Sequence, residues 1–198
     1  MKTKIVIVLF VCLSFINCSE DKDDFPNELP AITQEGKDTA GCLVDGELVL
    51  KRGRTGGIPG PNSPFVIINT PNRERNFWEL GVRFVDNFFN EKSGASVTIS
   101  IKSEAEFKEG ISYSLLEFTM NDNNSSEGYL SISPKDAVTS FSAVTNESYK
   151  GTLIITRLVL EGDNPFIAGT FEFQAESSGG RVFNVTDGRF DLKIDEIN

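Results

Sequence analysis

The chain has 198 residues and a formal net charge of −10, with 29 acidic residues against 19 basic ones. This acidic balance disfavours nucleic acid and anionic membrane surfaces as partners, because both repel negative charge. The chain contains no histidine, which removes the commonest general base, the Ser-His and Cys-His nucleophile pairs, and zinc sites built from His and Cys.

The first eighteen residues have the pattern of a secretory signal. Two lysines precede an apolar run over residues 5–16, and Cys18 follows shortly after. The run is too short to cross a bilayer, which needs ~20 apolar residues. Residues 15–18 resemble the lipobox of bacterial lipoproteins, whose cysteine is lipidated and becomes the first mature residue, although Phe15 and Asn17 depart from the strict consensus. The alternative is an ordinary signal peptide in which Cys18 is incidental.

An acidic run occupies residues 19–24. It resembles the export tag that directs Bacteroidetes lipoproteins to the outer face of the outer membrane; alternatively it is only a solvated tether, since like charges repel. Removal of the signal takes two lysines and leaves a net charge near −12, so membrane attachment must come from acyl chains. We predict a signal peptide over 1–17, a flexible tether over 18–40 and a single β domain over 41–198.

Beyond the tether, short runs of β-branched and aromatic residues alternate with turn residues. The sharpest signal is Asp45-Gly46 between Cys42–Val44 and Glu47–Leu50, because an Asp-Gly pair between apolar runs favours a tight hairpin. Several later runs alternate apolar and polar residues, as strands of an antiparallel sheet with one buried face do. These further strands are expected at 64–70, 76–85, 95–102, 112–120, 127–133, 148–160, 166–175, 181–185 and 189–194. Such a series of short strands predicts an all-β fold, an antiparallel β-sandwich of roughly ten strands, with a β-barrel as the alternative.

The two ends of the mature chain resemble corresponding parts of known sequences. Residues 29–36 with 41–47, and residues 167–173 with 184–191, resemble the first and last parts of small Bacteroidetes lipoproteins of unknown function. The two ends bracket nearly the whole mature domain, whereas the middle of the chain shows no such likeness. The resemblance implies a lipid-anchored, β-rich envelope protein and implies no activity. Within the last motif, residues 186–188 are expected to form a turn before a final strand.

Two predicted loops carry candidate ligand-binding residues. The Gly/Pro-rich segment 51–62 places Arg52 and Arg54 on an otherwise acidic protein, where they could bind an anionic glycan or a partner protein. The alternative is a loop whose charges are merely solvated. Phe88 and Phe89 could form an exposed aromatic pair for carbohydrate stacking, with packing into the core as the alternative.

Three other segments have a chemical interpretation and a structural one. Asp122, Asn124 and Glu127 lie in an oxygen-rich segment that could bind a hard cation, but it lacks the EF-hand spacing and is also typical of a hairpin loop. Thr39 lies in a short acceptor pattern for O-glycosylation, or else in a plain linker. Cys42 lies in an expected strand, so we predict a buried, inert thiol.

We therefore expect a lipid-anchored protein at the surface of the outer membrane, acting as a binding or accessory module for glycan or for an envelope protein. One alternative is a carboxylate-dependent polysaccharide hydrolase, although no catalytic pair can be nominated. Another is a structural subunit that assembles through an edge strand. We expect no cofactor and no nucleic-acid partner.

Overall fold

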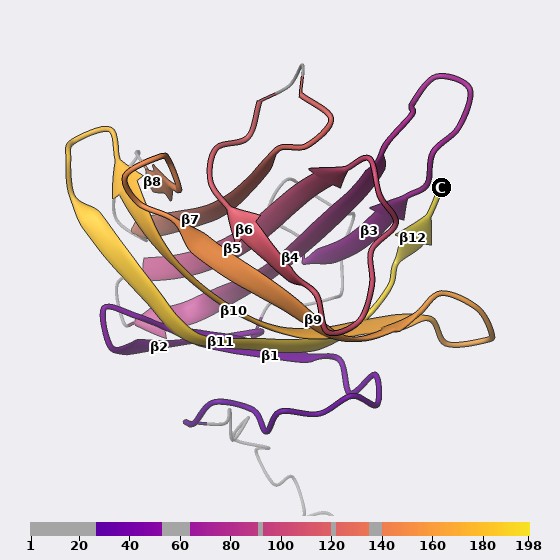
Figure 1. The fold of residues 1–198 in the computed structure, drawn as a ribbon. Helices are drawn as coiled ribbons and strands as arrows, with labels where there is room; N and C mark the ends of the chain where they lie inside the picture. Colours follow the sequence, from indigo (N-terminus) through magenta and orange to yellow (C-terminus); the bar gives the residue numbers. More distant parts are fainter. Residues whose placement is uncertain (1–26, 53–63, 91–92, 120–121, 135–139) are drawn as a thin grey trace, which may run out of the picture.

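The computed structural model describes residues 27–52, 64–90, 93–119, 122–134 and 140–198, and their regular structure is entirely β-strand (Figure 1). The strands are β1 (Thr39–Val44), β2 (Glu47–Leu50), β3 (Phe65–Asn69), β4 (Trp78–Asn90), β5 (Ser93–Ser103), β6 (Ser112–Leu115), β7 (Ser126–Pro134), β8 (Phe141–Val144), β9 (Gly151–Val159), β10 (Phe166–Ser177), β11 (Val182–Lys193) and β12 (Glu196–Ile197). The predicted all-β class is confirmed. Within the described residues there is no helix of the length and hydrophobicity needed to cross a membrane.

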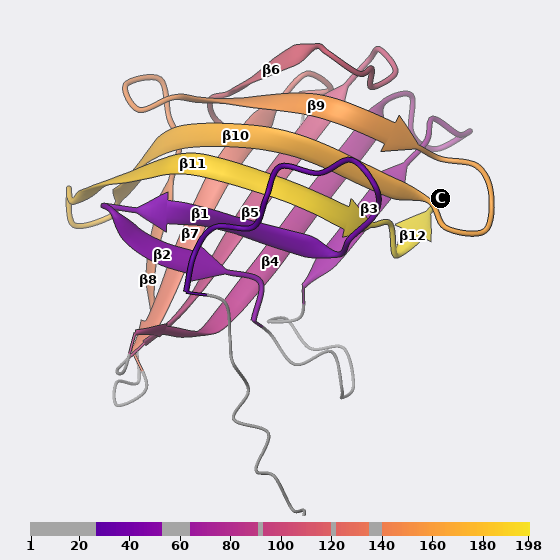
Figure 2. The same cartoon turned by 90° about the horizontal axis from the view of Figure 1, so that it is seen from below.

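The strands form one curled sheet in the order β12-β3-β4-β5-β7-β8-β10-β11-β1-β2, with β9 paired to β10 and β6 paired to β9. Neighbours are antiparallel except β12 and β3, which are parallel. Strands β9, β10, β11, β1 and β2 cross β4, β5 and β7, so the sheet curls into a half-barrel (Figure 2). β10 makes the bend possible, because it pairs with β9 over 166–173 and with β8 at 176–177. The arrangement combines features of the predicted sandwich and of its barrel alternative.

The core lies between the two crossing sides of the half-barrel. The rings of Phe84 on β4 and Phe171 on β10 have centroids 6.1 Å apart, and Phe190 on β11 lies 6.2 Å from Phe171. All three side chains are buried. Both ring pairs are tilted, at 53° and 31°, and such contacts add to the stabilisation from burial of apolar area. The alternation expected in several runs is seen on β5, where Val97, Ile99 and Ile101 are buried and the polar residues between them are only partly so.

The predicted tight hairpin of β1 and β2 is confirmed. Val44 pairs with Glu47, and the two turn residues have positive φ, 50° for Asp45 and 86° for Gly46. Positive φ at both central residues is what a two-residue turn of this type requires. Oδ1 of Asp45 accepts a hydrogen bond of 2.9 Å from the backbone N–H of Asn184 on β11. This contact fixes the turn beside the start of β11.

The loop predicted around Phe88 and Phe89 is wrong. β4 continues through both residues to Asn90, and its pairing with β5 shifts register between Asp86 and Asn90. A bulge of this kind accommodates extra residues in one strand without ending it. The sequence suggested a loop because Asp and Asn flank the two rings.

The turn predicted at 186–188 is also wrong. β11 runs unbroken over Val182–Lys193, and its pairing with β10 shifts register opposite Phe171–Phe173. Asp187 has a φ of 54° at this shift. The turn-like residues therefore form a bulge inside one long strand.

The folded domain begins before the predicted boundary at residue 41. β1 starts at Thr39, and residues 33–37 lie against the outer side of β11. Both carboxylate oxygens of Asp191 accept hydrogen bonds there, from the Thr33 hydroxyl at 2.6 Å and from three consecutive backbone N–H groups at 2.8–3.2 Å. Residues 33–40 thus belong to the folded domain rather than to a flexible tether.

Candidate functional site

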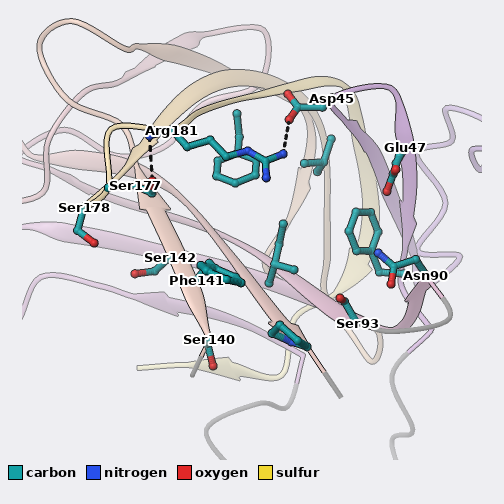
Figure 3. Close-up of a pocket in the computed structure, with 16 residues that line it drawn as sticks. Asp45, Glu47, Asn90, Ser93, Ser140, Phe141, Ser142, Ser177, Ser178 and Arg181 are labelled. Atoms are coloured by element: carbon teal, nitrogen blue, oxygen red, sulfur yellow. Dashed lines mark hydrogen bonds and ion pairs between the residues drawn. The ribbon is translucent and has the colours of Figure 1, made fainter. Parts of the chain in front are cut away.

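A cavity of about 660 Å³ opens at one end of the half-barrel (Figure 3). Five segments meet around it: the β1–β2 turn, the junction of β4 and β5, the end of β7, the start of β8 and the β10–β11 hairpin. Its volume falls in the ~300–1,000 Å³ range typical of small-molecule pockets. The curl of the sheet brings these five segments together, although they lie far apart in the sequence.

The inner wall of the cavity is apolar. Phe89 and Ile132 are partly buried and pack against the core, and Phe183 is buried. Phe141 on β8 pairs with Ile132 on β7 but is 58% exposed. Figure 3 shows the Phe141 ring directed toward the cavity. The wall therefore continues the core outward and ends in an aromatic side chain at the mouth.

The mouth of the cavity is polar. Ser93, Ser140, Ser142, Ser177, Ser178 and Asn90 line it. Ser140 and Ser142 flank Phe141, so their side chains point away from the strand face that carries its ring, and Figure 3 shows the Ser142 hydroxyl directed away from that ring. The Ser177 hydroxyl accepts a hydrogen bond from the Arg181 N–H and can still donate one. The mouth thus offers a few neutral polar groups to a ligand.

The charged groups of the lining are two carboxylates and one guanidinium. Arg181 has its Nη2 atom 3.4 Å from Oδ2 of Asp45 and its Cζ atom 4.3 Å from the centre of the Phe183 ring. Among the described lining residues Arg181 is the one cation, and its charge already faces Asp45. Glu47, the second carboxylate, is exposed at the same edge.

Arg52, which the sequence suggested as a ligand-binding cation, is held inside the protein. Its Nη2 and Nε atoms lie 2.7 and 3.0 Å from the carboxylate of Asp86, whose side chain is fully buried. The Arg52 side chain is only 12% exposed. The prediction that Arg52 contacts a ligand is therefore not supported by its position, and Arg54 lies outside the described residues.

Phe88 and Phe89 do not form the predicted exposed pair. Phe89 lines the cavity, whereas Phe88 is 49% exposed and its carbonyl accepts a hydrogen bond from Arg52. Of the two, only Phe89 belongs to the candidate site.

The predicted cation-binding residues have other partners. Oδ1 of Asp122 accepts a hydrogen bond from the Asn124 N–H, and Oδ1 of Asn124 accepts one from the Glu104 N–H. Glu127 lies on β7, where burial raises the pKa of its carboxyl. No group of three Asp, Glu or Cys side chains in the described part of the chain could hold a metal ion.

The remaining predicted site residues lie away from the cavity. Thr39 is the half-buried first residue of β1. Cys42 is fully buried, and burial, with a smaller contribution from the charge of Asp86, raises the pKa of its thiol, which agrees with the prediction of an inert thiol. Cys18 lies outside the described residues.

Sequence reasoning missed most of the cavity. Phe141 lies on a four-residue strand in the middle of the chain, where no family resemblance was found. Arg181 follows a Ser-Ser-Gly-Gly segment, which indicates a hairpin turn but no ligand. No motif joins these residues, because only the curl of the sheet places them together. Comparisons of the chain with known protein families, curated proteins and solved structures gave no match.

Proposed function

We propose that this is a lipid-anchored binding protein of the cell envelope that captures a glycan in the cavity at the end of its half-barrel. The cavity is the observation that carries the proposal, because it combines an apolar wall with a few polar groups at its mouth. Binding sites for small molecules typically have this composition, with apolar area for affinity and a few polar groups for orientation. The signal-like residues 1–18 supply the envelope part of the proposal.

The cavity favours binding over hydrolysis. Glycoside hydrolysis commonly uses two carboxyl groups that flank the scissile bond. Asp45 already accepts a hydrogen bond from Asn184 through one oxygen and faces Arg181 through the other. Among the described lining residues, this leaves Glu47 as the one carboxylate without such partners, whereas hydrolysis needs two.

Assembly through an edge strand is also less favoured. The sheet ends in β12 and β2, and the side branch ends in β6. Within the described residues these three edges are two, four and four residues long. Short edges offer few unpaired backbone groups to another chain.

The proposed tether would be short. Thr33 is bonded to Asp191 on β11 and lies fifteen residues after Cys18. At ~3.3–3.6 Å per residue, a fully extended chain from Cys18 to Thr33 spans roughly 50 Å. A lipid on Cys18 would therefore hold the domain within this distance of the membrane surface.

Mass spectrometry of the N-terminal peptide of the mature protein tests the anchor. We expect the peptide to begin at Cys18 with acyl chains attached, and the Cys18→Ser variant to leave the membrane fraction. Protease treatment of intact cells should remove the domain if it faces outward. A bare Cys18 thiol, or a retained leader, would contradict the anchor.

Glycan binding is tested with the detergent-solubilised full-length protein on an array of envelope, plant and host glycans. We expect binding that Phe141→Ala weakens, since this ring stands at the cavity mouth. Failure to bind any glycan on the array would contradict the proposed function. Binding that Phe141→Ala leaves unchanged would mean that the glycan-binding site lies outside the cavity.

A further inference from the structure

The electrostatic balance of the cavity mouth bears on which glycans it can hold. Arg181 is the one cation among the described lining residues, and it lies between Asp45, at 3.4 Å, and the ring of Phe183. Figure 3 shows its guanidinium directed at Asp45 across the top of the cavity. An anionic ligand that approached Arg181 would also approach the Asp45 carboxylate. The ion pair therefore offers little net attraction for a negative charge.

Glu47 makes the cavity mouth still less attractive to an anionic ligand. It lines the same mouth, is exposed, and follows Asp45 by two residues in the hairpin. An ionised carboxylate can only accept hydrogen bonds, so it needs a ligand that donates them. A sugar hydroxyl donates, whereas the carboxylate or sulfate group of an acidic sugar offers only further acceptors. The lining as a whole carries two negative charges against one positive charge.

The other lining groups match a neutral sugar ring. A serine hydroxyl such as that of Ser93, which lines the cavity, can exchange hydrogen bonds with sugar hydroxyls in either direction. Phe141 presents an exposed ring at the mouth, and the C–H face of a sugar can cover such a ring and remove it from water.

We infer that the cavity is selective for uncharged oligosaccharides and excludes uronic acids and sulfated sugars through the carboxylates of Glu47 and Asp45. The inference rests on the proposed glycan-binding function and adds the class of glycan. In the bound state the sugar hydroxyls donate to Glu47, and one apolar sugar face lies on Phe141.

Titration calorimetry with defined oligosaccharides tests the inference on the detergent-solubilised full-length protein. The neutral probes are maltohexaose, xylohexaose and mannohexaose; the acidic probes are a galacturonate hexamer and a chondroitin sulfate hexasaccharide. We expect at least one neutral probe to bind at least tenfold more tightly than either acidic probe. Raising the salt concentration should reduce this preference, because repulsion between exposed charges is screened.

Two variants with matched controls locate the effect. Glu47→Lys should improve binding of the acidic probes by roughly tenfold relative to the neutral ones, whereas Glu172→Lys, an exposed charge reversal on β10, should not. Phe141→Ala should weaken binding of the neutral probe by roughly five- to tenfold, as loss of an aromatic contact predicts. Phe88→Ala, which removes a ring of similar exposure outside the cavity, should leave it unchanged.

The outcomes separate the inference from the proposed function. Equal binding of acidic and neutral probes, or a preference that Glu47→Lys leaves intact, would overturn the charge selectivity while glycan binding stands. Binding of acidic probes alone would also overturn it. If none of the probes binds and the glycan array is empty as well, the proposed function fails and the inference fails with it.

Discussion

The guanidinium of Arg52 lies 2.7 Å from the buried carboxylate of Asp86, and this ion pair joins two distant parts of the sheet. Arg52 follows β2 at one end of the strand order, whereas Asp86 belongs to β4 near the other end. The backbone adds two contacts, because the Arg52 N–H donates to the Val85 carbonyl and the Leu50 N–H donates to Asp86. The pair therefore helps to close the half-barrel beside the cavity.

Breaking this pair should strongly destabilise the protein. Arg52→Ala leaves the Asp86 carboxylate buried without its cation, a loss that typically costs about 3–5 kcal/mol. Urea denaturation followed by far-UV circular dichroism measures the effect. The control is Arg157→Ala, which breaks an exposed pair with Glu109 and should cost at most about 1 kcal/mol. Similar losses in the two variants would show that Arg52 contributes only as a surface charge.

Asp191 should make stability depend on acidic pH. Burial tends to raise the pKa of its carboxyl, but the hydrogen bonds from Thr33 and from the N–H groups of residues 35–37 outweigh burial, so the pKa lies below its ordinary value. A depressed pKa in the folded state adds stability that is present above the unfolded value of ~3.9 and is lost as pH falls through the lower folded value. Hydrogen bonds to a charged group are worth about 1.5–3 kcal/mol each.

The Asp191→Asn variant measures this contribution. Its free energy of unfolding should fall below that of the natural chain at pH 7, and the two should converge as the pH drops toward 2. Hydrogen exchange of the amides at residues 35–37 should accelerate in the variant. Asp163→Asn, in an exposed loop, is the control and should change neither quantity. A constant difference between the natural chain and Asp191→Asn across the pH range would contradict the role of ionisation.

The local fold could be predicted from the sequence where a residue pattern is sufficient by itself. The Asp45-Gly46 turn and the alternation along β5 are of this kind, because turn chemistry and strand period depend on neighbouring residues. The bulges at Asp86–Asn90 and at Asp187 were misread, since Asp, Asn and Gly favour turns and bulges alike. The same composition therefore pointed to chain reversals that do not occur.

The candidate site could not be predicted, for a different reason. Arg52 looked like a free cation because its partner, Asp86, lies 34 residues away. Phe141 and Arg181 meet at the cavity only through the curl of the sheet. Contacts of this range depend on the register and bending of several strands, which no local pattern encodes. The candidate site among the described residues is therefore a cavity assembled from five segments.

Gly169 on β10 should tolerate no side chain. A Cβ atom there would lie 2.7 Å from both the Phe190 ring and the Ile154 carbonyl oxygen. Gly169→Ala should cost about 1–3 kcal/mol, as overpacking of a core typically does. Gly179→Ala in the β10–β11 hairpin is the control, because the nearest atom to its Cβ would be a serine hydroxyl at 3.9 Å. Thermal unfolding of both variants measures the difference, and equal melting temperatures would contradict the tight packing at Gly169.

The number of reactive thiols tests both the proposed lipid anchor at Cys18 and the burial of Cys42. The chain has three cysteines; processing would remove Cys12 and acylation would block Cys18, which leaves Cys42. Cys42 is fully buried, and its raised pKa keeps the side chain in the protonated thiol form, which is unreactive. The mature membrane-extracted protein should therefore show no reaction with Ellman's reagent when folded and one thiol per chain in guanidinium chloride.

The Cys18→Ser and Cys42→Ser variants assign each thiol in this assay. Cys42→Ser should abolish the reaction of the unfolded protein, because Cys18 carries an acyl chain on its sulfur. Rapid labelling of the folded natural chain that Cys18→Ser removes would reveal a free thiol at Cys18 and contradict the lipid anchor. Rapid labelling that only Cys42→Ser removes would instead mean that solvent reaches the interior of the half-barrel at β1.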